Sequence, residues 1–305
     1  MSAPHDDLRI GTLVPVQPAS HTAPELIRQL LPHGFESFQL TAWQDVTALD
    51  LPKLAEEVRA ALADSGAVIS ALGVYGNPLG RESIDEATRQ SWRRLIDNAP
   101  LFGCDLVAGF AGGVVGGTVP ESIPRFREVF TELAAYAADR SVRLAFENCR
   151  PRGSHWEHVT TNIAFNPDAW ELMFNAVPAA NLGLEWEPCH QMVQFIDPLP
   201  QIMAWKDRLF HLHGKDATVR HDYIRRHGVS SAEMPVWHRT PGFGDSNWTD
   251  LISELRRAGF RGAIDIEGFH DPVYKDELEM VGQVRALAYL KQCRGGDAVP
   301  SPYQS

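Results

Sequence analysis

The sequence predicts an α/β protein built as a single (β/α)8 TIM barrel. Short apolar or β-branched runs alternate eight times with longer amphipathic stretches along the 305 residues. Parallel neighbouring strands need crossover connections, and closing the sheet removes its exposed edges. An open, doubly wound sheet is the alternative, but no GxGxxG sequence follows an early strand. No repeat and no low-complexity linker divides the chain, so we expect one domain rather than two.

Eight runs have the length and composition of buried parallel strands. In chain order they are 8–14, 37–43, 67–73, 105–110, 142–148, 181–187, 209–214 and 263–268. Helices are expected among them at 51–65, 84–102, 123–140, 167–176, 199–207, 248–258 and 275–292. The barrel domain is expected to cover residues 1–294, with lid-like loops at 150–166 and 217–247, followed by a flexible C-terminal tail at 295–305.

The charge balance limits the possible partners. Twenty-eight basic residues oppose 39 acidic residues, and the net charge of −11 repels phosphate backbones and anionic membranes. No apolar run reaches the roughly 20 residues that span a bilayer, and the amino terminus has no secretion signal. We therefore expect a cytoplasmic protein that binds neither nucleic acid nor membrane. Cys104, Cys149, Cys189 and Cys293 are far apart and are expected to be reduced thiols.

Acidic or histidine residues lie at the ends of the last four predicted strands: Glu147, Glu187, His213 and Glu267. The carboxyl ends of barrel strands meet at one mouth, so these side chains are expected to converge. Burying three carboxylates without a counter-charge costs several kcal/mol each, which a bound cation would avoid. Three carboxylates and one imidazole suit Mn²⁺ first, with Mg²⁺, Co²⁺ or Zn²⁺ as alternatives.

A second layer of polar residues is expected deeper in the same four strands. Side chains on a strand alternate between its two faces, so residues two or four apart share the barrel interior. On this basis we interpret Arg143, Glu185, His211 and Asp265 as a buried polar network that supports the metal ligands.

Five motifs follow one another in the second half of the chain. They are FEN at 146–148, GLEWEPCH at 183–190, HLHGKD at 211–216, PGFGDSNW at 241–248 and the glutamate at 267. In order and spacing they resemble the xylose-isomerase-like TIM-barrel superfamily, which includes the sugar phosphate isomerase/epimerase family. The barrel pattern extends the resemblance over nearly the whole chain.

The resemblance implies roles for individual residues. It implies that Glu147, Glu187, His213 and Glu267 bind the metal, that Glu147 and Glu267 also act as catalytic base and acid, and that His190 faces the substrate. The chain departs from the family pattern at Glu187, where the family has an aspartate, and after Glu267, where GFH replaces HED. The longer side chain at 187 changes where that carboxylate can meet a metal.

Further substrate contacts are expected around the mouth. His155 lies in the polar loop after the fifth strand, and Trp43 and Tyr75 end or follow the second and third strands. Lys215 either adds positive charge to the substrate site or is an ordinary surface lysine. The insertion at 217–239 is long for a barrel loop and rich in Arg, His and Tyr, so we expect it to be functional or to lie at an oligomer interface.

These features predict a divalent-metal-dependent isomerase or epimerase that acts on a sugar or polyol-derived ketone through a metal-bound enediolate. One alternative is a lyase that carries out β-elimination on 3-keto-glycosides, because the same enolisation can expel a leaving group. Another is a non-catalytic sugar-binding subunit, either in a homo-oligomer or beside a partner subunit. Abasic-site endonucleases share the fold of the family, but they use a histidine-rich metal cluster and a basic face, which do not fit this acidic chain.

Overall fold

Eight parallel strands close into one barrel in this computed structural model, which describes residues 7–17 and 21–296. Around the barrel the order is β1-β10-β7-β6-β5-β4-β3-β2. Their bounds are β1 Leu8–Pro15, β2 Ser37–Trp43, β3 Val68–Tyr75, β4 Leu106–Gly109, β5 Arg143–Glu147, β6 Leu182–Trp186, β7 Leu209–Gly214 and β10 Gly262–Ile266. The predicted TIM barrel is thereby confirmed. Most of the predicted tail, residues 297–305, lies outside the described residues, and the lid role of the two loops stays a prediction.

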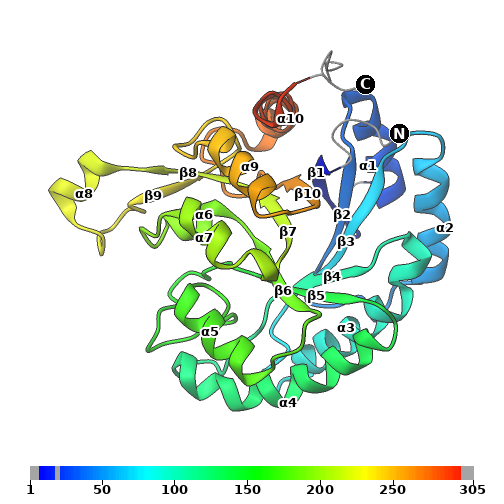
Figure 1. Ribbon diagram of the computed structural model, residues 1–305, viewed down its shortest axis with the longest axis horizontal. Coiled ribbons are helices and arrows are strands. Elements are labelled where there is room, and N and C mark those ends of the chain that lie inside the picture. Colours follow the sequence, from blue (N-terminus) through cyan, green and yellow to red (C-terminus); the bar gives the residue numbers. More distant parts are fainter. Residues whose placement is uncertain (1–6, 18–20, 297–305) are drawn as a thin grey trace.

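Helices surround the barrel in chain order, from α1 in blue to α10 in red, except that α8 lies away from the barrel (Figure 1). Their bounds are α1 Ala23–Leu30, α2 Leu51–Leu62, α3 Ser83–Phe102, α4 Val119–Ala138, α5 Pro167–Ala176, α6 Pro188–Met192, α7 Pro198–Ala204, α8 His221–His227, α9 Trp248–Arg257 and α10 Glu279–Arg294, with 3-10 turns at Leu31–His33, Lys206–Arg208 and Asp276–Leu278. Among the described residues, no helix is long and apolar enough to cross a membrane.

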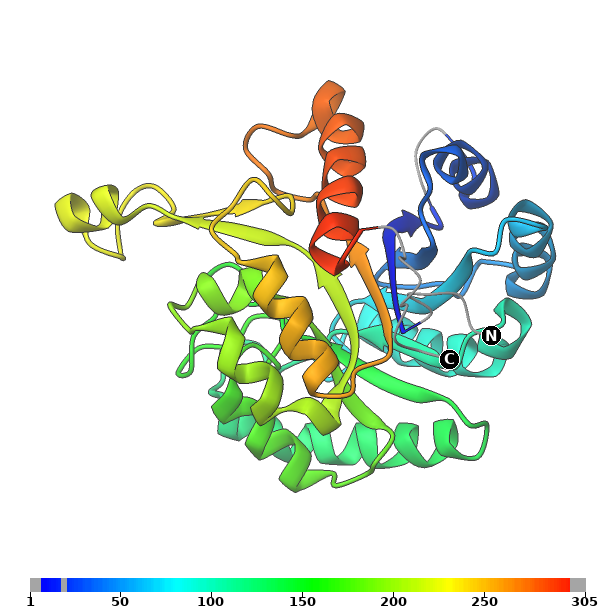
Figure 2. The same ribbon diagram turned by 45° about the horizontal axis from the view of Figure 1, so that its top comes forward.

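The predicted loop 217–247 contains a two-stranded hairpin that was not predicted. β8 (Asp216–Val219) pairs antiparallel with β9 (Val236–Arg239), and α8 lies between them. We call residues 216–239 the arm. Its root packs on α6, where Ala217 and Val236 form one apolar cluster with Cys189. Figures 1 and 2 both show the arm, in yellow, extending away from the barrel with α8 at its far end.

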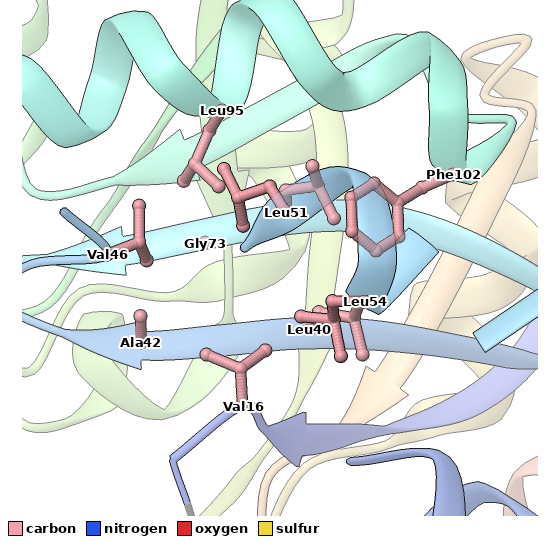
Figure 3. Close-up of a pocket in the computed structure, with 10 residues that line it drawn as sticks. Val16, Leu40, Ala42, Val46, Leu51, Leu54, Gly73, Leu95 and Phe102 are labelled. Atoms are coloured by element: carbon pink, nitrogen blue, oxygen red, sulfur yellow. The ribbon is translucent and has the colours of Figure 1, made fainter. Parts of the chain in front are cut away.

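The layer between the barrel wall and the helices is apolar. Phe146 on β5 packs edge-on against Phe130 of α4, with ring centroids 4.7 Å apart. On another side of the barrel, apolar side chains including Leu40, Leu51 and Phe102 line a pocket between the wall and helices α2 and α3 (Figure 3). No polar side chain lines this pocket, so it belongs to the core packing and not to a sugar site.

Part of the inside of the barrel is polar. Asp265 on β10 is fully buried and accepts hydrogen bonds from the hydroxyl groups of Ser37 (2.5 Å) and Ser70. The Nε2 atom of His211 lies 2.8 Å from the same carboxylate. Gly11 on β1 leaves room for these groups, since a Cβ atom there would lie 2.2 Å from Asp265 Oδ1.

The predicted polar network contains three of its four expected members. Glu185, His211 and Asp265 are buried, and Glu185 Oε1 lies 3.1 Å from His211 Nδ1. The prediction was wrong for Arg143. That residue is the first of β5, at the amino end of the barrel, and its side chain reaches solvent to pair with Asp105 (2.9 Å). A strand's first residue is too far from the mouth to support ligands there.

The last helix is tied to the start of the barrel by Arg294. Its guanidinium donates to the carbonyl oxygen of Leu8 (2.7 Å) and to both carboxylate oxygens of Glu36 (2.5 and 3.0 Å). Burial raises the pKa of Glu36, but the Arg294 hydrogen bonds and charge outweigh burial and lower the pKa to about 2. The pair therefore stabilises the closed barrel as long as Glu36 is ionised.

Replacing Glu36 by Gln is expected to lower the free energy of unfolding by about 2 kcal/mol at pH 7, because it leaves the largely buried Arg294 without its counter-charge. Because the pKa of Glu36 is lowered, the stabilisation is fully present at pH values above the ordinary carboxyl pKa of 4.5. The stabilisation is lost as the pH falls toward about 2, where Glu36 becomes protonated. Urea unfolding at pH 7 and pH 3 should therefore show a smaller difference between parent and variant at pH 3. The exposed Glu57→Gln is the control, and a difference that does not change with pH would contradict this explanation.

Candidate active site

The four predicted metal ligands meet at the carboxyl end of the barrel. Glu147 ends β5, His213 lies near the end of β7, and Glu187 and Glu267 directly follow β6 and β10. All four side chains are buried, and one ligand atom from each lies within 4.8 Å of the others. His213 Nδ1 is 3.1 Å from Glu267 Oε2, 3.5 Å from Glu147 Oε1 and 3.9 Å from Glu187 Oε2. We call these residues the four-residue cluster.

Gln39 on β2 sets the orientation of the imidazole in the cluster. Its Nε2 donates to Glu185 Oε1 (2.6 Å), so its Oε1 accepts from His213 Nε2 (2.8 Å). This assignment leaves Nδ1 of His213 as the atom that faces the three carboxylates. Burial disfavours a charged imidazole, but Glu185 and the cluster carboxylates raise the pKa of His213 well above its usual range. The cluster therefore attracts either a proton or a cation to Nδ1.

Several cluster atoms lack hydrogen-bond partners, although histidine nitrogens lie close to two of their carboxylate oxygens. Both carboxylate oxygens of Glu187, Nδ1 of His213 and Oε2 of Glu267 are buried and have no hydrogen-bond partner within the described part of the chain. Buried polar groups are normally hydrogen-bonded, so a group of unpartnered atoms in one place needs an explanation. Three carboxylates and one imidazole are donors that Mn²⁺, Mg²⁺ and Co²⁺ accept. The cluster therefore fits a divalent cation.

The two carboxylates predicted as catalytic have different surroundings. Burial raises the pKa of Glu147 to about 7. Burial also acts against ionised Glu267, but Lys215 and His213 together outweigh burial and keep the pKa of Glu267 well below its usual range. Environments that separate two carboxyl pKa values also separate their acid–base roles. Glu147 can exchange a proton near neutral pH, whereas Glu267 stays ionised.

Lys215 is not a surface lysine, so that alternative is wrong. It is 2% exposed, and its Nζ donates to Glu267 Oε1 (2.6 Å) and lies 3.9 Å from Glu187 Oε1. Burial acts against its charge, yet Glu187 and Glu267 raise the pKa of Lys215 well above its usual range. Lys215 therefore holds a permanent positive charge beside the cluster.

Two asparagines fix the backbone that carries the cluster. Asn148 accepts from the backbone N–H of Glu187 (2.8 Å) and donates to its carbonyl oxygen (2.9 Å). Asn162 donates to the carbonyl oxygens of Glu147 (3.0 Å) and Cys149 (2.9 Å). The FEN motif thus supplies both a cluster carboxylate and the amide that positions Glu187. The role of Asn162 was not predicted, because the residue comes from a separate part of the loop.

A row of imidazole rings lies beside the cluster. His190 Nε2 is 2.9 Å from Glu187 Oε1, and its ring stands perpendicular to that of His238, with centroids 5.1 Å apart. The ring of His270 follows at 5.7 Å from His238. Burial, together with the charge of Lys215, lowers the pKa of His238 to about 2, so this ring is neutral. His238 was not predicted because it lies on the unpredicted strand β9.

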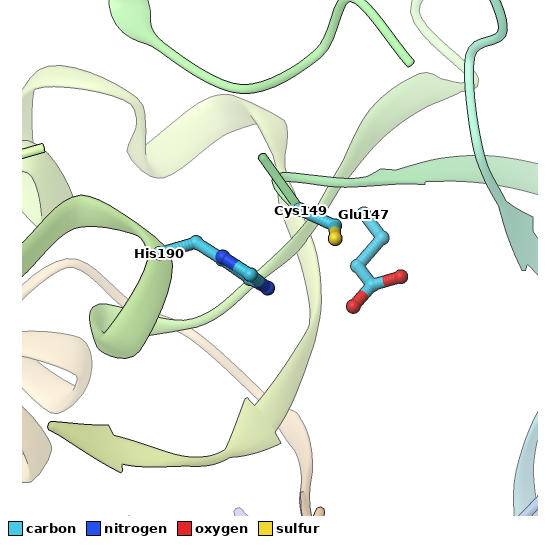
Figure 4. Close-up of side chains that lie close together, drawn as sticks. All are labelled: Glu147, Cys149 and His190. Carbon is cyan, nitrogen blue, oxygen red and sulfur yellow. The ribbon is translucent and has the colours of Figure 1, made fainter. Parts of the chain in front are cut away.

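Cys149 also lies close to the cluster. The side chains of Glu147, Cys149 and His190 point toward one space (Figure 4), and their ligand atoms lie within 4.8 Å of one another. Burial raises the pKa of Cys149 well above its usual range, so the thiol stays neutral. All four cysteines are free, as predicted.

Aromatic rings lead from the cluster to the surface. The ring of Tyr75 lies 6.4 Å from that of His213, Phe110 lies 5.4 Å from Tyr75, and Trp43 lies 6.4 Å from Phe110. Trp43 is 67% exposed and free to contact a ligand at the rim. Tyr75 differs from expectation, because its hydroxyl donates to buried Glu185 (2.7 Å) and so belongs to the polar network.

His155 is the predicted site residue that the structure does not bring to the cluster. It is exposed in the 150–166 loop, and its ring lies 5.7 Å from that of His158. Within the described residues, no hydrogen bond or ring contact joins His155 to the four-residue cluster. A role for His155 in binding substrate stays a prediction.

The fold and the cluster together define a family. A closed parallel barrel with carboxylates and a histidine at its mouth matches the family model described as xylose isomerase-like TIM barrel over residues 27–292. The chain belongs to the xylose isomerase-like TIM barrel family, and the predicted resemblance is confirmed.

Two curated relatives match part of the chain. A rhizopine catabolism protein, MocC of Rhizobium meliloti, is 27% identical over 166 residues, which cover 53% of this chain and 44% of that protein. An inosose dehydratase of Lactiplantibacillus plantarum is 28% identical over 142 residues, which cover 46% of each. The matched part of the chain spans less than half the length of these relatives.

Solved structures with the same fold include several sugar epimerases. A 3-keto-D-glucoside 4-epimerase from E. coli superposes with a TM-score of 0.69 at 16% identity, covering 94% of this chain and 100% of that chain. A D-allulose 3-epimerase from Methylomonas sp. superposes with a TM-score of 0.67 at 18% identity, covering 96% and 100%. At these identities the likeness establishes the fold.

Proposed function

We propose that this chain is a divalent-metal-dependent isomerase or epimerase that moves a proton beside the carbonyl group of a sugar or polyol-derived ketone. The observation that carries the proposal is the four-residue cluster, with four buried atoms that have no hydrogen-bond partner. The structural relatives that act on D-allulose and 3-keto-D-glucoside support a keto-sugar as the substrate class.

The residues of the chain divide the chemistry between them. Glu147, Glu187, His213 and Glu267 would hold a divalent cation, which would supply positive charge to acidify a C–H bond next to a carbonyl group. Glu147, a carboxylate of the cluster, is placed to take up the proton and to return it to the substrate, which completes an isomerisation. Glu267 directly follows β10, and β6 and β7 lie between β10 and β5 in the barrel. The carboxylates of Glu147 and Glu267 would therefore approach a bound substrate from different sides. Lys215 holds Glu267 in place through one oxygen.

Deuterium incorporation tests the proposal. The purified protein with added Mn²⁺ is incubated in D₂O with keto-sugars and 3-keto-glycosides, and the products are followed by NMR. We expect deuterium at the carbon next to the carbonyl group, with the carbon skeleton retained. An absence of exchange across this panel, from protein shown to hold its metal, would count against the proposal and favour a non-catalytic sugar-binding subunit.

Elimination is the second candidate function. The sequence similarity to an inosose dehydratase favours it, since a dehydratase expels water after a proton is lost. His190, whose Nε2 lies 2.9 Å from Glu187 Oε1, offers a ring at the cluster that can protonate a leaving group. Release of water or an aglycone from a keto-substrate in the same NMR experiment would establish a lyase in place of an isomerase.

Shortening Glu187 to Asp is expected to weaken Mn²⁺ binding by about 10- to 100-fold, because the carboxylate retreats by about 1.5 Å from a cluster built around glutamate. Titration of free Mn²⁺ by electron paramagnetic resonance measures this change, with the exposed Glu171→Asp as control. Unchanged binding in Glu187→Asp would mean that the glutamate does not hold the metal, and tighter binding would mean that the cluster is not built around glutamate.

A further inference from the structure

Exposed apolar side chains gather on two segments that the proposed function does not use. Of the 15 large apolar side chains that are exposed in the described part of the chain, 8 lie within residues 229–237 and 269–281. The first segment belongs to the arm and presents Val229, Met234 and Trp237, which are 53%, 48% and 39% exposed. Apolar groups concentrated in this way mark interaction surfaces.

The second segment borders the candidate site. We call residues 269–281 the rim segment, since it begins two residues after Glu267 and ends in the first turn of α10. Its exposed apolar side chains are Phe269, Val273, Leu278, Met280 and Val281. The ring of His270 in this segment lies 5.7 Å from His238 at the root of the arm. The arm and the rim segment therefore form one continuous face.

The two parts of this face carry opposite charges. Residues 220–239 of the arm include four arginines and three histidines against one aspartate and one glutamate, which pair with Arg225 and Arg220. The rim segment presents Asp276, Glu277 and Glu279, which are exposed and make no ion pair with another described residue. In a chain with a net charge of −11, a basic tip and an acidic apolar rim on the same face are complementary to each other.

The end of the arm is incomplete by itself. Helix α8 has only seven residues and none of them is buried. A short helix and a two-stranded hairpin are only marginally stable in water unless they pack against another surface. Figures 1 and 2 show α8 well away from the rim segment of its own chain, so among the described residues this segment does not cover it, and a second chain can supply the complementary surface.

We infer that this face binds a second copy of the same chain, with the arm tip of each copy on the rim segment of the other. A two-fold dimer contains this contact twice: the arm tip of the first copy lies on the rim segment of the second, and the arm tip of the second lies on the rim segment of the first. Since the rim segment borders the candidate site, the arm of each copy would lie at the mouth of the other. Stable interfaces of this kind bury about 800 Å² per partner.

Charge reversal in the full-length protein tests the pairing. Light scattering coupled to size exclusion is expected to give twice the 33.9 kDa mass of one chain for the parent. Arg225→Glu with Arg226→Glu should raise the dimer dissociation constant by at least about 10-fold, because it places like charges together. Glu277→Arg with Glu279→Arg should do the same. The four changes combined should restore the dimer to within about 10-fold of the parent.

The control is Arg59→Glu, an exposed residue of α2 that should leave the dimer intact. Circular dichroism and thermal unfolding confirm that each variant is folded. A monomeric parent, a dimer that both charge reversals leave unchanged, or a combined variant that stays monomeric would each overturn the inference. Because this test needs no substrate, its outcome is separate from that of the proposed function.

Discussion

Replacing Glu147 by Gln is expected to lower the rate of deuterium incorporation by at least about 10³-fold on any keto-sugar that the parent exchanges. Two effects combine in this loss. Gln cannot accept the proton that the Glu147 carboxylate is proposed to take from the substrate. It also removes one of the three carboxylates that surround His213 Nδ1. The rate is measured by NMR in D₂O with saturating Mn²⁺.

The matched control is Glu171→Gln, since Glu171 is exposed on α5 and does not belong to the cluster. Its exchange rate should stay within a factor of two of the parent, as for most surface substitutions. If Glu147→Gln kept the parent rate while remaining folded, proton transfer would have to be assigned to another residue, and the roles given to Glu147 and Glu267 would be wrong.

Replacing Asp265 by Ala is expected to lower the free energy of unfolding by about 4 kcal/mol. The carboxylate is fully buried and accepts hydrogen bonds from Ser37 and Ser70, and it lies 2.8 Å from His211 Nε2. Its removal leaves two hydroxyl groups and one imidazole in the barrel interior without that partner, and unsatisfied buried groups are costly. Urea unfolding followed by circular dichroism measures the change.

Asp105→Ala provides the comparison. Asp105 pairs with Arg143 at the amino end of the barrel, where the two side chains are 61% and 39% exposed. Exposed ion pairs contribute about 1 kcal/mol or less, so this variant should be nearly as stable as the parent. Equal losses in the two variants would show that the interior network contributes no more than a surface pair.

The barrel strands were predictable because each satisfies a local rule. Apolar runs such as the one at 209–214 are short, lie between helical patterns and need no distant partner to be identified. The cluster was predictable for a related reason. His213 and Glu267 lie at or just after strand ends, and in a parallel barrel all strand ends meet at one mouth. The period-two spacing in HLHGKD then places both histidines in the interior.

Other features depend on contacts between distant residues. Gln39 and Tyr75 come from β2 and β3, and only the closed barrel places them beside Glu185. The arm has four-residue strands rich in polar side chains, so no alternating pattern distinguishes it from a loop. Lys215 can be buried because Glu187 and Glu267 compensate its charge. These two residues are distant from Lys215 in sequence, so its burial could not be predicted from its neighbours in the chain.

One missed boundary had a local signal. Helix α4 begins at Val119, whereas residue 123 was predicted. Thr118 and Glu121 form a capping box, in which Glu121 N–H donates to the threonine hydroxyl (3.2 Å) and Thr118 N–H donates to the glutamate (2.8 Å). This spacing of threonine and glutamate is a recognised sign of a helix start, so the boundary could have been predicted.

The most direct test of the central claim is a titration of Mn²⁺ into the metal-free protein, with unbound Mn²⁺ measured by electron paramagnetic resonance. The four-residue cluster predicts one tight site per chain in the parent and none in His213→Ala, since Nδ1 of this residue faces all three carboxylates. A parent chain that binds no divalent cation, or a His213→Ala variant that binds one as tightly as the parent, would contradict the assignment of the cluster as the metal centre.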